Sequence, residues 1–360
     1  MNIGVLGAGQ LGRMLALAGY PLGLRCLFLD PAEDACAGQV AGQIVAPYDD
    51  PGALDRLAAR CEVVTFEFEN VPEAAVSRLA ARHPVYPGPR ALAAAQDRLN
   101  EKNLFHELGI DTPPFAAVSS REELDAAAET IGLPLVVKTR RLGYDGKGQA
   151  VVREPAELEA AWKRLGDVPL LAEAFVPFER EVSVLGVRAR SGECAFYPLV
   201  ENRHRHGILY LSRPRPGDPF TDAAQDWCRR LMEALDYTGV LALELFQHDG
   251  RLLANEFAPR VHNSGHWTIE GAETSQFENH LRAICGLPLG ETRAVAPTAM
   301  VNLIGNLPAR EAVTAIAGAH LHDYGKEPRP GRKVGHVTLR AADEAQLDLS
   351  LQRLLSLLPG

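Results

Sequence analysis

Apolar and polar residues alternate along the first ninety residues in a way that predicts strands separated by helices. Short apolar runs at Asn2–Leu6, Arg25–Leu29 and Val63–Phe66 have the length of buried strands. Between the first two runs, apolar positions from Gln10 to Gly19 recur at helical spacing. Because strands that alternate with helices form a parallel, helix-covered sheet, we expect a Rossmann-like domain over residues 1–90.

The middle of the chain predicts a larger mixed region over residues 91–295, with two lobes that divide near residues 165–180. Its first expected element is a helical segment over Ala91–Leu108. A hairpin is expected around Asp249-Gly250, because Asp-Gly is a strong signal for a tight turn between strands. The other expected elements are strands at Leu135–Lys138, Gln149–Arg153, Leu170–Phe175, Glu181–Arg188, Ala195–Leu199, Gly239–Phe246 and Arg251–Phe257, and helices at Glu154–Leu165, Phe220–Leu235 and Glu273–Ile284.

The tail, residues 296–360, predicts a small C-terminal domain. A helix is expected over Arg310–Ala317, a strand over Gly335–Arg340 and a closing helix after it. The expected fold class is therefore α/β and α+β multidomain, with a Rossmann-like βαβ domain before the mixed region.

Composition and charge narrow the class of protein. The chain has 360 residues, which suits two or three domains, and its 46% hydrophobic content allows a large core. A formal net charge of −9 argues against broad nucleic-acid binding, since an acidic chain repels polyphosphate. No apolar run reaches the length of a membrane span, no leader is recognisable, and the six cysteines form no Cys-x-x-Cys motif. We expect a cytoplasmic protein without membrane or nucleic-acid partners.

The turn after the first strand carries a G-x-G-x-x-G pattern, Gly7–Gly12, and Asp30 ends the next strand. Glycines let the backbone approach a phosphate, and a helix N-terminus attracts its charge. The pattern is typical of NAD or FAD binding, of a tight turn that only packs a helix, and of a site for the phosphate of a small substrate. We favour the third interpretation. Its expected contacts are Gly9, Gln10 and Leu11.

A second glycine-rich segment, Gly143–Gln149, lies between two expected strands and follows Lys138, Arg140 and Arg141. Exposed amides together with cations are the groups that bind a triphosphate. A lid of this kind also keeps water from a reactive acyl phosphate. The segment lacks the Gly-Lys-Ser/Thr of a P-loop, so we expect a different type of ATP site. The alternative is an ordinary glycine-rich hairpin with solvated lysines.

Two carboxylates are expected to meet on the predicted hairpin. With a three-residue loop Glu244 faces Glu256, and with a two-residue loop it faces Asn255 while Glu256 is diagonal to it. Like charges that face each other are destabilising unless a cation lies between them. Mg²⁺ takes one or two carboxylates together with substrate phosphates. The hairpin therefore predicts a Mg²⁺ or Mn²⁺ site; the alternative is that one glutamate faces solvent.

A polar string, Pro259–Thr268, follows the hairpin directly. Loops that leave a sheet are where binding sites are built. Arg260 suits an oxyanion or a phosphate, and Asn263 and Ser264 suit polar contacts with a substrate. The string predicts a substrate site next to the cation site.

These features together resemble the ATP-grasp superfamily. More narrowly, the chain is similar to the 5-(carboxyamino)imidazole ribonucleotide synthase family of purine biosynthesis, and the similarity runs from Met1 to at least His336. The segments that carry the wider resemblance are Lys138, Gly143–Gln149, Glu173–Val176, Glu181, Glu244 and Asn255-Glu256. The stretches that carry the narrower one are Gly7–Arg13, Arg141–Gln149, Asn255–Thr268 and Ser275–Ala283.

The resemblance implies a role for each matching residue. The implied ATP contacts are Arg98, Lys138, Gly143, Tyr144, Asp145, Gly146, Lys147, Gly148, Gln149, Glu173, Ala174, Phe175, Val176, Glu181, His204, Asn255 and Glu256. The implied metal ligands are Glu244 and Glu256. The implied substrate contacts are Tyr144, Asp145, Lys147, Lys326 and Arg332. They join Gly9, Gln10, Leu11, Asn263 and Ser264, which the glycine turn and the polar string already predict. The implied catalytic residues are Asp145, as proton acceptor from an amine, Lys326 and Arg260.

The resemblance also implies a reaction. ATP and bicarbonate give carboxyphosphate, and this intermediate, or CO₂ from it, is captured by the exocyclic amine of 5-aminoimidazole ribonucleotide. It further implies a homodimer that passes its product to a downstream mutase. Three alternatives stay open: a formate-dependent glycinamide ribonucleotide formyltransferase of the same superfamily, a nicotinamide-dependent oxidoreductase that uses Gly7–Gly12, and a non-catalytic nucleotide-binding module, against which the acidic metal ligands argue.

Overall fold

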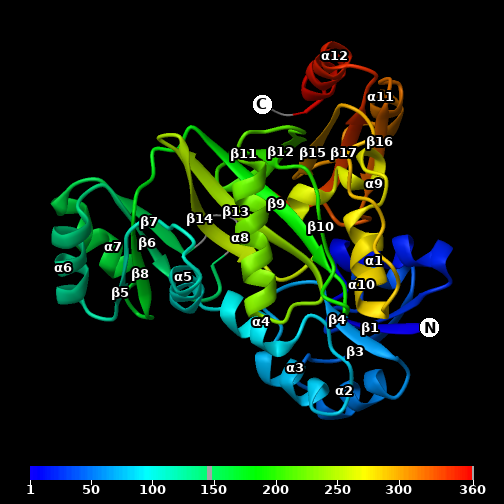
Figure 1. The fold of residues 1–360 in the computed structure, drawn as a ribbon, viewed down its shortest axis with the longest axis horizontal. Helices are drawn as coiled ribbons and strands as arrows, with labels where there is room; N and C mark the ends of the chain where they lie inside the picture. The colour runs from blue at the N-terminus through cyan, green and yellow to red at the C-terminus, as the bar shows by residue number, and fades with distance from the viewer. Residues whose placement is uncertain (144–147, 359–360) are drawn as a thin grey trace.

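Three sheets make up the molecule, and the computed structural model describes residues 1–143 and 148–358 of the chain (Figure 1). The first sheet is parallel and lies near the N-terminus, whereas the other two are antiparallel. The predicted mixture of an α/β domain with α+β regions is confirmed.

The N-terminal sheet has the order β3-β2-β1-β4 and is fully parallel. The expected helix after its first strand has the predicted bounds, and it buries Leu11, Met14 and Leu15. These residues share one core with Leu281 and Ile284 of helix α10, so the domain packs firmly on the large sheet's helices. The elements of this region are strands β1 Asn2–Leu6, β2 Arg25–Asp30, β3 Gly42–Val45 and β4 Val63–Phe66, helices α1 Gln10–Gly19, α2 Pro51–Ala58 and α3 Glu73–Ala80, and short 3-10 turns η1 Tyr20–Leu22 and η2 Cys36–Gln39.

The helical segment predicted over Ala91–Leu108 is divided into two helices in the structure. Helix α4 covers Pro89–Ala95 and α5 covers Arg98–Glu107. Asp97 has extended backbone and caps α5, with its carboxylate accepting from the amide of Leu99. The break therefore has a local cause: an aspartate N-cap inside an otherwise helical run.

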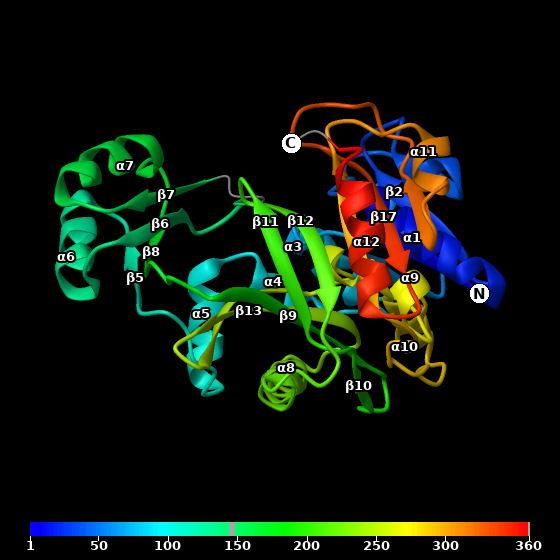
Figure 2. The same cartoon turned by 90° about the horizontal axis from the view of Figure 1, so that it is seen from above.

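A four-stranded antiparallel sheet of order β5-β8-β6-β7 forms a separate lobe (Figure 2). Its helices α6 and α7 share one hydrophobic core with its strands, built around Leu124, Leu135 and Ala161. The elements of the lobe are β5 Phe115–Val118, α6 Arg121–Ile131, β6 Leu135–Thr139, β7 Gln149–Val152, η3 Pro155–Glu157, α7 Leu158–Leu165 and β8 Leu170–Ala174.

The largest sheet has nine strands in the order β14-β13-β9-β11-β12-β15-β17-β16, with β10 paired to β9. Helices α8 and α10 pack against its strands (Figure 1). Its elements before residue 296 are β9 Arg180–Arg188, β10 Cys194–Phe196, β11 Val200–Arg205, β12 Ile208–Pro214, α8 Thr221–Ala234, β13 Gly239–His248, β14 Arg251–Ala258, η4 Asn263–Gly265, α9 Thr268–Gly271 and α10 Gln276–Cys285.

Strands β11 and β12 were not predicted, and the strand expected over Ala195–Leu199 ends at Phe196. Strand β11 is rich in charged and amide side chains, so it lacks the alternation of apolar and polar residues that predicts a strand. The turn uses His206 and Gly207, which both have positive φ, 51° and 75°. Such a turn fits a two-residue hairpin, but His-Gly is not one of the strong sequence signals for it.

The C-terminal strands extend the large sheet. Strand β12 pairs with β15, with Leu211 opposite Val301 and Ser212 opposite Met300. The described part of the tail therefore adds its strands to the large sheet and has no separate sheet. Helix α11 ends at Thr314, about one turn earlier than predicted. The elements of the tail are β15 Thr298–Ile304, α11 Arg310–Thr314, β16 Ala319–Asp323, β17 Lys333–Arg340 and α12 Glu344–Leu355.

Within the described ranges, no helix combines the length and the apolar character that crossing a membrane requires. All six cysteines are free, and four of them are buried.

Candidate functional site

A cleft of about 700 Å³ lies where the three sheets meet. The N-terminal domain contributes Gln10, Leu11 and the stretch Glu67–Asn70 to its walls. The residues that line the rest of the cleft include Arg98, Lys138, Gly143, Gln149, Glu173, Ala174, Phe175, Val176, Phe178, Glu181, Asn202, His204, Glu244, Phe246, Asn255, Glu256, Arg260, His262, Asn263 and Lys333. The cleft therefore collects most of the residues that the sequence assigned to ATP, metal and substrate.

The glycine loop after β1 already holds a carboxylate. Glu67, at the end of β4, accepts a hydrogen bond of 2.6 Å from the amide of Gly12 and another from the amide of Gly9. Its side chain is 6% exposed, and burial raises the pKa of the Glu67 carboxyl although the two amides and Lys326 favour its charge. The amides of Gly9 and Gly12 therefore have Glu67 as their acceptor in this structure, and the contact of Gly9 with a substrate phosphate stays a prediction.

Asp30 also bonds within the N-terminal domain, to the backbone of the glycine loop. Its carboxylate accepts from the amide of Ala8 at 2.9 Å and from the hydroxyl of Tyr48 at 2.7 Å. A ribose-binding carboxylate would be free to meet a ligand. Gln10 and Leu11 line the cleft, so only the helix end of this loop faces it.

On the opposite side of the cleft, two lysines hold one glutamate. Glu173 of β8 contacts Lys138 of β6 through Oε2, and its Oε1 lies 2.7 Å from Lys102 Nζ. Burial would raise the pKa of the Glu173 carboxyl, but the two ammonium groups outweigh it and hold the pKa well below its usual range. Lys102 also donates to the carbonyls of Ala254 and Asn255 at 3.1 and 2.8 Å.

Lys102 was not among the predicted site residues, although a signal for it existed. Arg98, Glu101, Lys102 and Phe105 recur at helical spacing, so one face of α5 carries three charges beside an aromatic ring. Such a face usually looks like solvent-exposed helix. In the structure Glu101 and Lys102 are 2% and 1% exposed, because the face packs on β14.

Strands β13 and β14 form the hairpin that carries the two predicted metal ligands, called the metal hairpin below. It has a two-residue turn and a β-bulge. The pairing runs from His248 with Arg251 to Leu245 with Ala254, and then shifts by one residue at Asn255. The bulge returns Glu256 to a position opposite Glu244. The two-residue turn is that of the second predicted register. The Glu244–Glu256 pairing, however, is the one expected for a three-residue loop.

Both carboxylates have partners on the cleft wall. Arg98 Nη1 lies 2.7 Å from Glu256 Oε2, and His262 Nε2 lies 2.9 Å from Glu244 Oε1. Burial raises the pKa of Glu256, but Arg98 dominates and lowers it to about 2. Each glutamate therefore keeps one oxygen near a cationic or donor group and has a second oxygen for another ligand.

The donor set fits a hard divalent cation. The Oδ1 atom of Asn255 is buried and lacks a hydrogen-bond partner among the described residues, and Asn255 lines the same cleft as Glu244 and Glu256. Carboxylate and amide oxygens are the ligands that Mg²⁺ and Ca²⁺ prefer. In residues 1–143 and 148–358 no group of three or more His, Cys, Asp or Glu side chains could hold a metal by itself. A cation here would complete its shell with substrate phosphates or water, as Mg²⁺ commonly does.

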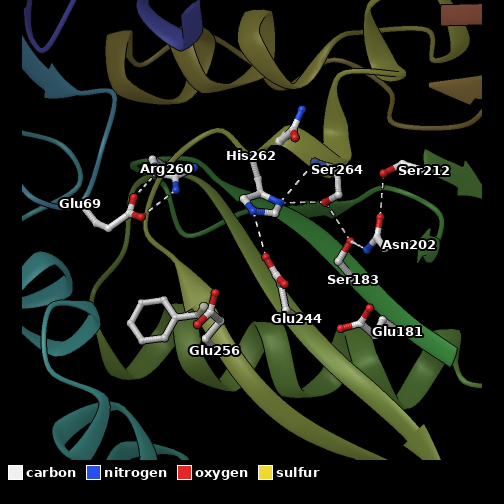
Figure 3. Close-up of polar contacts among 12 residues, drawn as sticks. Glu69, Glu181, Ser183, Asn202, Ser212, Glu244, Glu256, Arg260, His262 and Ser264 are labelled. Carbon is white, nitrogen blue, oxygen red and sulfur yellow. Dashed lines mark hydrogen bonds and ion pairs between the residues drawn. The ribbon is translucent and has the colours of Figure 1, made fainter. Parts of the chain in front are cut away.

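The polar string after β14 divides between the cleft and the core. Figure 3 shows Arg260 paired with Glu69, and His262 directed toward Glu244. Arg260 lines the cleft and pairs with Glu69, with Nη2 2.9 Å from Oε1. Asn263 also lines it and bonds to Asn302. Ser264 is fully buried and bonds to Ser183, and its contact with a substrate stays a prediction.

The remaining predicted residues lie at several places. Glu181 Oε2 is 2.5 Å from His204 Nδ1, and this contact raises the pKa of His204 against the effect of burial. Lys326 bonds to the amide oxygen of Gln10, and Arg332 donates to the carbonyl of Glu327. Gly148 has φ +70° and lies against Thr139. Tyr144, Asp145, Gly146 and Lys147 lie outside the described residues.

Three family models match the chain. Residues 1–96 match the ribonucleotide synthetase preATP-grasp domain, and residues 103–277 match the ATP-grasp domain. Residues 298–349 match the phosphoribosylaminoimidazole carboxylase C-terminal domain.

Whole-chain relatives agree with these models. The chain is 56% identical over 358 residues to N5-carboxyaminoimidazole ribonucleotide synthase of Pseudomonas aeruginosa, and the match covers 99% of each chain. The crystal structure of N5-carboxyaminoimidazole ribonucleotide synthetase from Thermus thermophilus matches with a TM-score of 0.96 and 57% identity, covering 99% of both chains. The Aspergillus clavatus N5-carboxyaminoimidazole synthase, in complex with ADP and 5-aminoimidazole ribonucleotide, matches with a TM-score of 0.92 and 32% identity over 99% and 98% of the two chains.

Proposed function

The chain belongs to the N5-carboxyaminoimidazole ribonucleotide synthase family of ATP-grasp enzymes, and on that premise we propose that it carboxylates 5-aminoimidazole ribonucleotide with ATP and bicarbonate. The products are N5-carboxyaminoimidazole ribonucleotide, ADP and phosphate, in purine biosynthesis. One observation carries the proposal: the Glu244–Glu256 pair, the Lys138–Glu173 pair and Arg260 line one cleft, although they come from separate parts of the fold.

The nucleotide is assigned to the side of the cleft between the small lobe and the large sheet. Lys138, Arg98 and His204 supply positive charge or donors there, and Val176, Phe178 and Phe246 provide an apolar wall for the adenine ring. The stacked rings of Phe178 and Phe246 have centroids 4.9 Å apart. The proposed ATP contacts are Arg98, Lys138, Gly143–Gln149, Glu173–Val176, Glu181, His204, Asn255 and Glu256.

We assign Mg²⁺, with Mn²⁺ as a substitute, to Glu244 and Glu256. The cation would neutralise the phosphate charge that develops during phosphoryl transfer. The protein's own part is to hold the two carboxylates opposite each other and to keep Glu256 ionised through Arg98. Asn255 Oδ1 is a further oxygen available at this point.

The imidazole substrate and bicarbonate are assigned to the side that faces the N-terminal domain. Arg260 suits an oxyanion and is oriented by Glu69. Lys326 is held by Gln10, and Asn263 lies on the same wall of the cleft as His262. Transfer of the γ-phosphoryl group of ATP to bicarbonate gives carboxyphosphate; the exocyclic amine then attacks its carbonyl carbon, or CO₂ released from it, phosphate leaves, and the amine proton passes to Asp145.

We further propose that the protein works as a homodimer in the cytoplasm and hands its product to a mutase. The six free cysteines suit a reducing compartment.

The reaction is tested directly with the purified protein. ATP, Mg²⁺ and bicarbonate are supplied with and without 5-aminoimidazole ribonucleotide, and ADP is measured. We expect ADP formation that depends on the ribonucleotide, with one carboxylated product per ADP. Absence of this stimulation contradicts the proposal. Stimulation by formate with glycinamide ribonucleotide would support the formyltransferase instead, and consumption of NADH would support an oxidoreductase.

A further inference from the structure

A line of buried hydrogen bonds leads from strand β12 to the metal hairpin (Figure 3). Ser212 Oγ lies 2.7 Å from Asn202 Oδ1, and Asn202 Nδ2 lies 2.9 Å from Ser183 Oγ. Ser183 Oγ in turn lies 2.8 Å from Ser264 Oγ. All four side chains are at most 5% exposed, so they depend on one another rather than on bulk water for their hydrogen bonds.

The line ends at His262, whose two ring nitrogens have partners of fixed polarity. At Nδ1 the backbone amide of Ser264 donates at 3.3 Å, and an amide N–H cannot accept. At Nε2 the Glu244 carboxylate lies 2.9 Å away, and an ionised carboxylate cannot donate. Both contacts are satisfied together by the tautomer that carries its proton on Nε2.

The hydrogen bonds behind the ring run in the direction that this tautomer requires, starting from the amide N–H of Asn202, which can only donate. Ser264 Oγ, 2.8 Å from Nδ1, must donate its proton to the ring, so it accepts from Ser183. Ser183 then accepts from the amide nitrogen of Asn202, whose oxygen accepts from Ser212. A hydroxyl that already accepts one bond is directed to donate the next, so the chain has one polarity from end to end.

We propose that Ser264, Ser183, Asn202 and Ser212 form a one-way hydrogen-bond chain that holds His262 as the Nε2–H tautomer and so fixes the Glu244 carboxylate. Ser183 and Asn202 are positioning residues: they act on the metal hairpin through His262. The link from Glu244 to a cation rests on the proposed function, whereas the tautomer of His262 does not.

The first test needs no substitution in the chain of hydrogen bonds. Histidine labelled with ¹⁵N is incorporated into the full-length protein, and ring nitrogens are observed by NMR roughly two pH units above the ordinary histidine pKa of about 6.5. The His262→Gln spectrum identifies the resonances of His262 among the 11 histidines. We expect a protonated Nε2 and an unprotonated Nδ1. A protonated Nδ1 in the unmodified protein overturns the proposal.

The second test breaks the chain two bonds from the ring. In Ser183→Ala, Ser264 loses its donor, so its hydroxyl becomes free to accept from a protonated Nδ1. We expect the Nδ1–H tautomer to become detectable and the Mg²⁺ concentration for half-maximal ATP turnover to rise about tenfold, as when a partner behind a metal ligand is lost. Asn202→Asp provides an independent variant, because an aspartate only accepts and would draw the Ser183 proton away from Ser264.

The matched control is Thr298→Val, which removes another buried hydroxyl of the same sheet that bonds to the carbonyl of Ala296 at 2.9 Å. This variant should leave both the His262 resonances and the Mg²⁺ midpoint unchanged. Unchanged resonances in both Ser183→Ala and Asn202→Asp overturn the proposal. A tautomer shift with an unchanged Mg²⁺ midpoint overturns the link to Glu244, and a protein with the expected tautomer but no ribonucleotide-dependent turnover overturns the proposed function alone.

Discussion

Lys102 Nζ lies 2.7 Å from Glu173 Oε1, and both side chains are almost completely buried, at 2% and 4% exposure. The pair joins helix α5 to the small lobe, and the two carbonyl bonds of Lys102 join it to strand β14 of the large sheet. One ammonium group therefore connects the two walls between which we place the nucleotide. Glu173 also pairs with Lys138, so Lys102 affects the position of Lys138 through Glu173.

Lys102→Met should lower the free energy of unfolding by about 3 kcal/mol, because the buried Glu173 carboxylate loses one of its two cationic partners. ADP should also bind more weakly, since the position of Lys138 depends on Glu173. Urea denaturation and calorimetric titration with ADP measure the two effects. Lys163→Met is the control: that side chain is 74% exposed and pairs with Glu159 of its own helix, so a change below about 0.5 kcal/mol is expected. Equal effects in both variants would refute the role of Lys102.

Glu67→Ala should destabilise the N-terminal domain by about 1–3 kcal/mol, because the amides of Gly9 and Gly12 lose their acceptor. The vacated loop keeps its glycines and its helix N-terminus, so inorganic phosphate should raise the melting temperature of this variant more than that of the unmodified protein. Differential scanning calorimetry across a phosphate series measures both. Glu62→Ala, at an exposed carboxylate that meets the amide of Asn2, should show neither effect.

Glu256→Gln and Glu244→Gln should each reduce ATP turnover at least about 100-fold, since even groups behind a metal ligand commonly contribute 10–100-fold. The fold should remain, which circular dichroism checks. Glu273→Gln removes a carboxylate that pairs with Arg293 on the exterior, and it should keep full turnover. Normal turnover in Glu256→Gln would show that the cation lies elsewhere.

His280 makes the stability depend on pH. Its Nδ1 accepts from the amide of Val240 and its Nε2 lies 3.0 Å from the hydroxyl of Thr65, so it joins the N-terminal sheet to the large sheet. Complete burial lowers the pKa of His280 from 6.5 to about 4. The unfolded chain therefore binds a proton more readily than the folded one, and stability is retained above pH 6.5 and lost as the pH falls toward 4.

The loss attributable to this histidine is about 3 kcal/mol across that range, from the size of the shift in pKa. Urea denaturation at pH 7 and pH 5 should show a smaller difference in the free energy of unfolding for His280→Gln than for the unmodified protein. The same difference in both proteins would assign the acid sensitivity to other groups.

Local sequence determined the elements whose signals are contained within a few residues. Helix α1 has the predicted bounds because its apolar spacing follows a glycine turn, and the β13–β14 turn forms at Asp249-Gly250 because φ is positive at both residues, 49° and 69°. The motif strings likewise indicated Lys138, Glu173, Glu244, Glu256 and Arg260 as candidate site residues, and all five line one cleft. Backbone preferences and strings of specific residues do not depend on distant contacts.

Tertiary structure alone decided which partners those residues have. Glu67 lies 55 residues after Gly12 along the chain. It reaches the glycine loop because its strand, β4, pairs with β1. Lys102 becomes buried because α5 packs on β14, and the bulge at Asn255 turns Glu256 to face Glu244. These relationships follow from how sheets pack and register, and a single sequence carries no local signal for either. The sequence by itself therefore determined the elements and the candidate groups, while the packing of the three sheets decided what each group contacts.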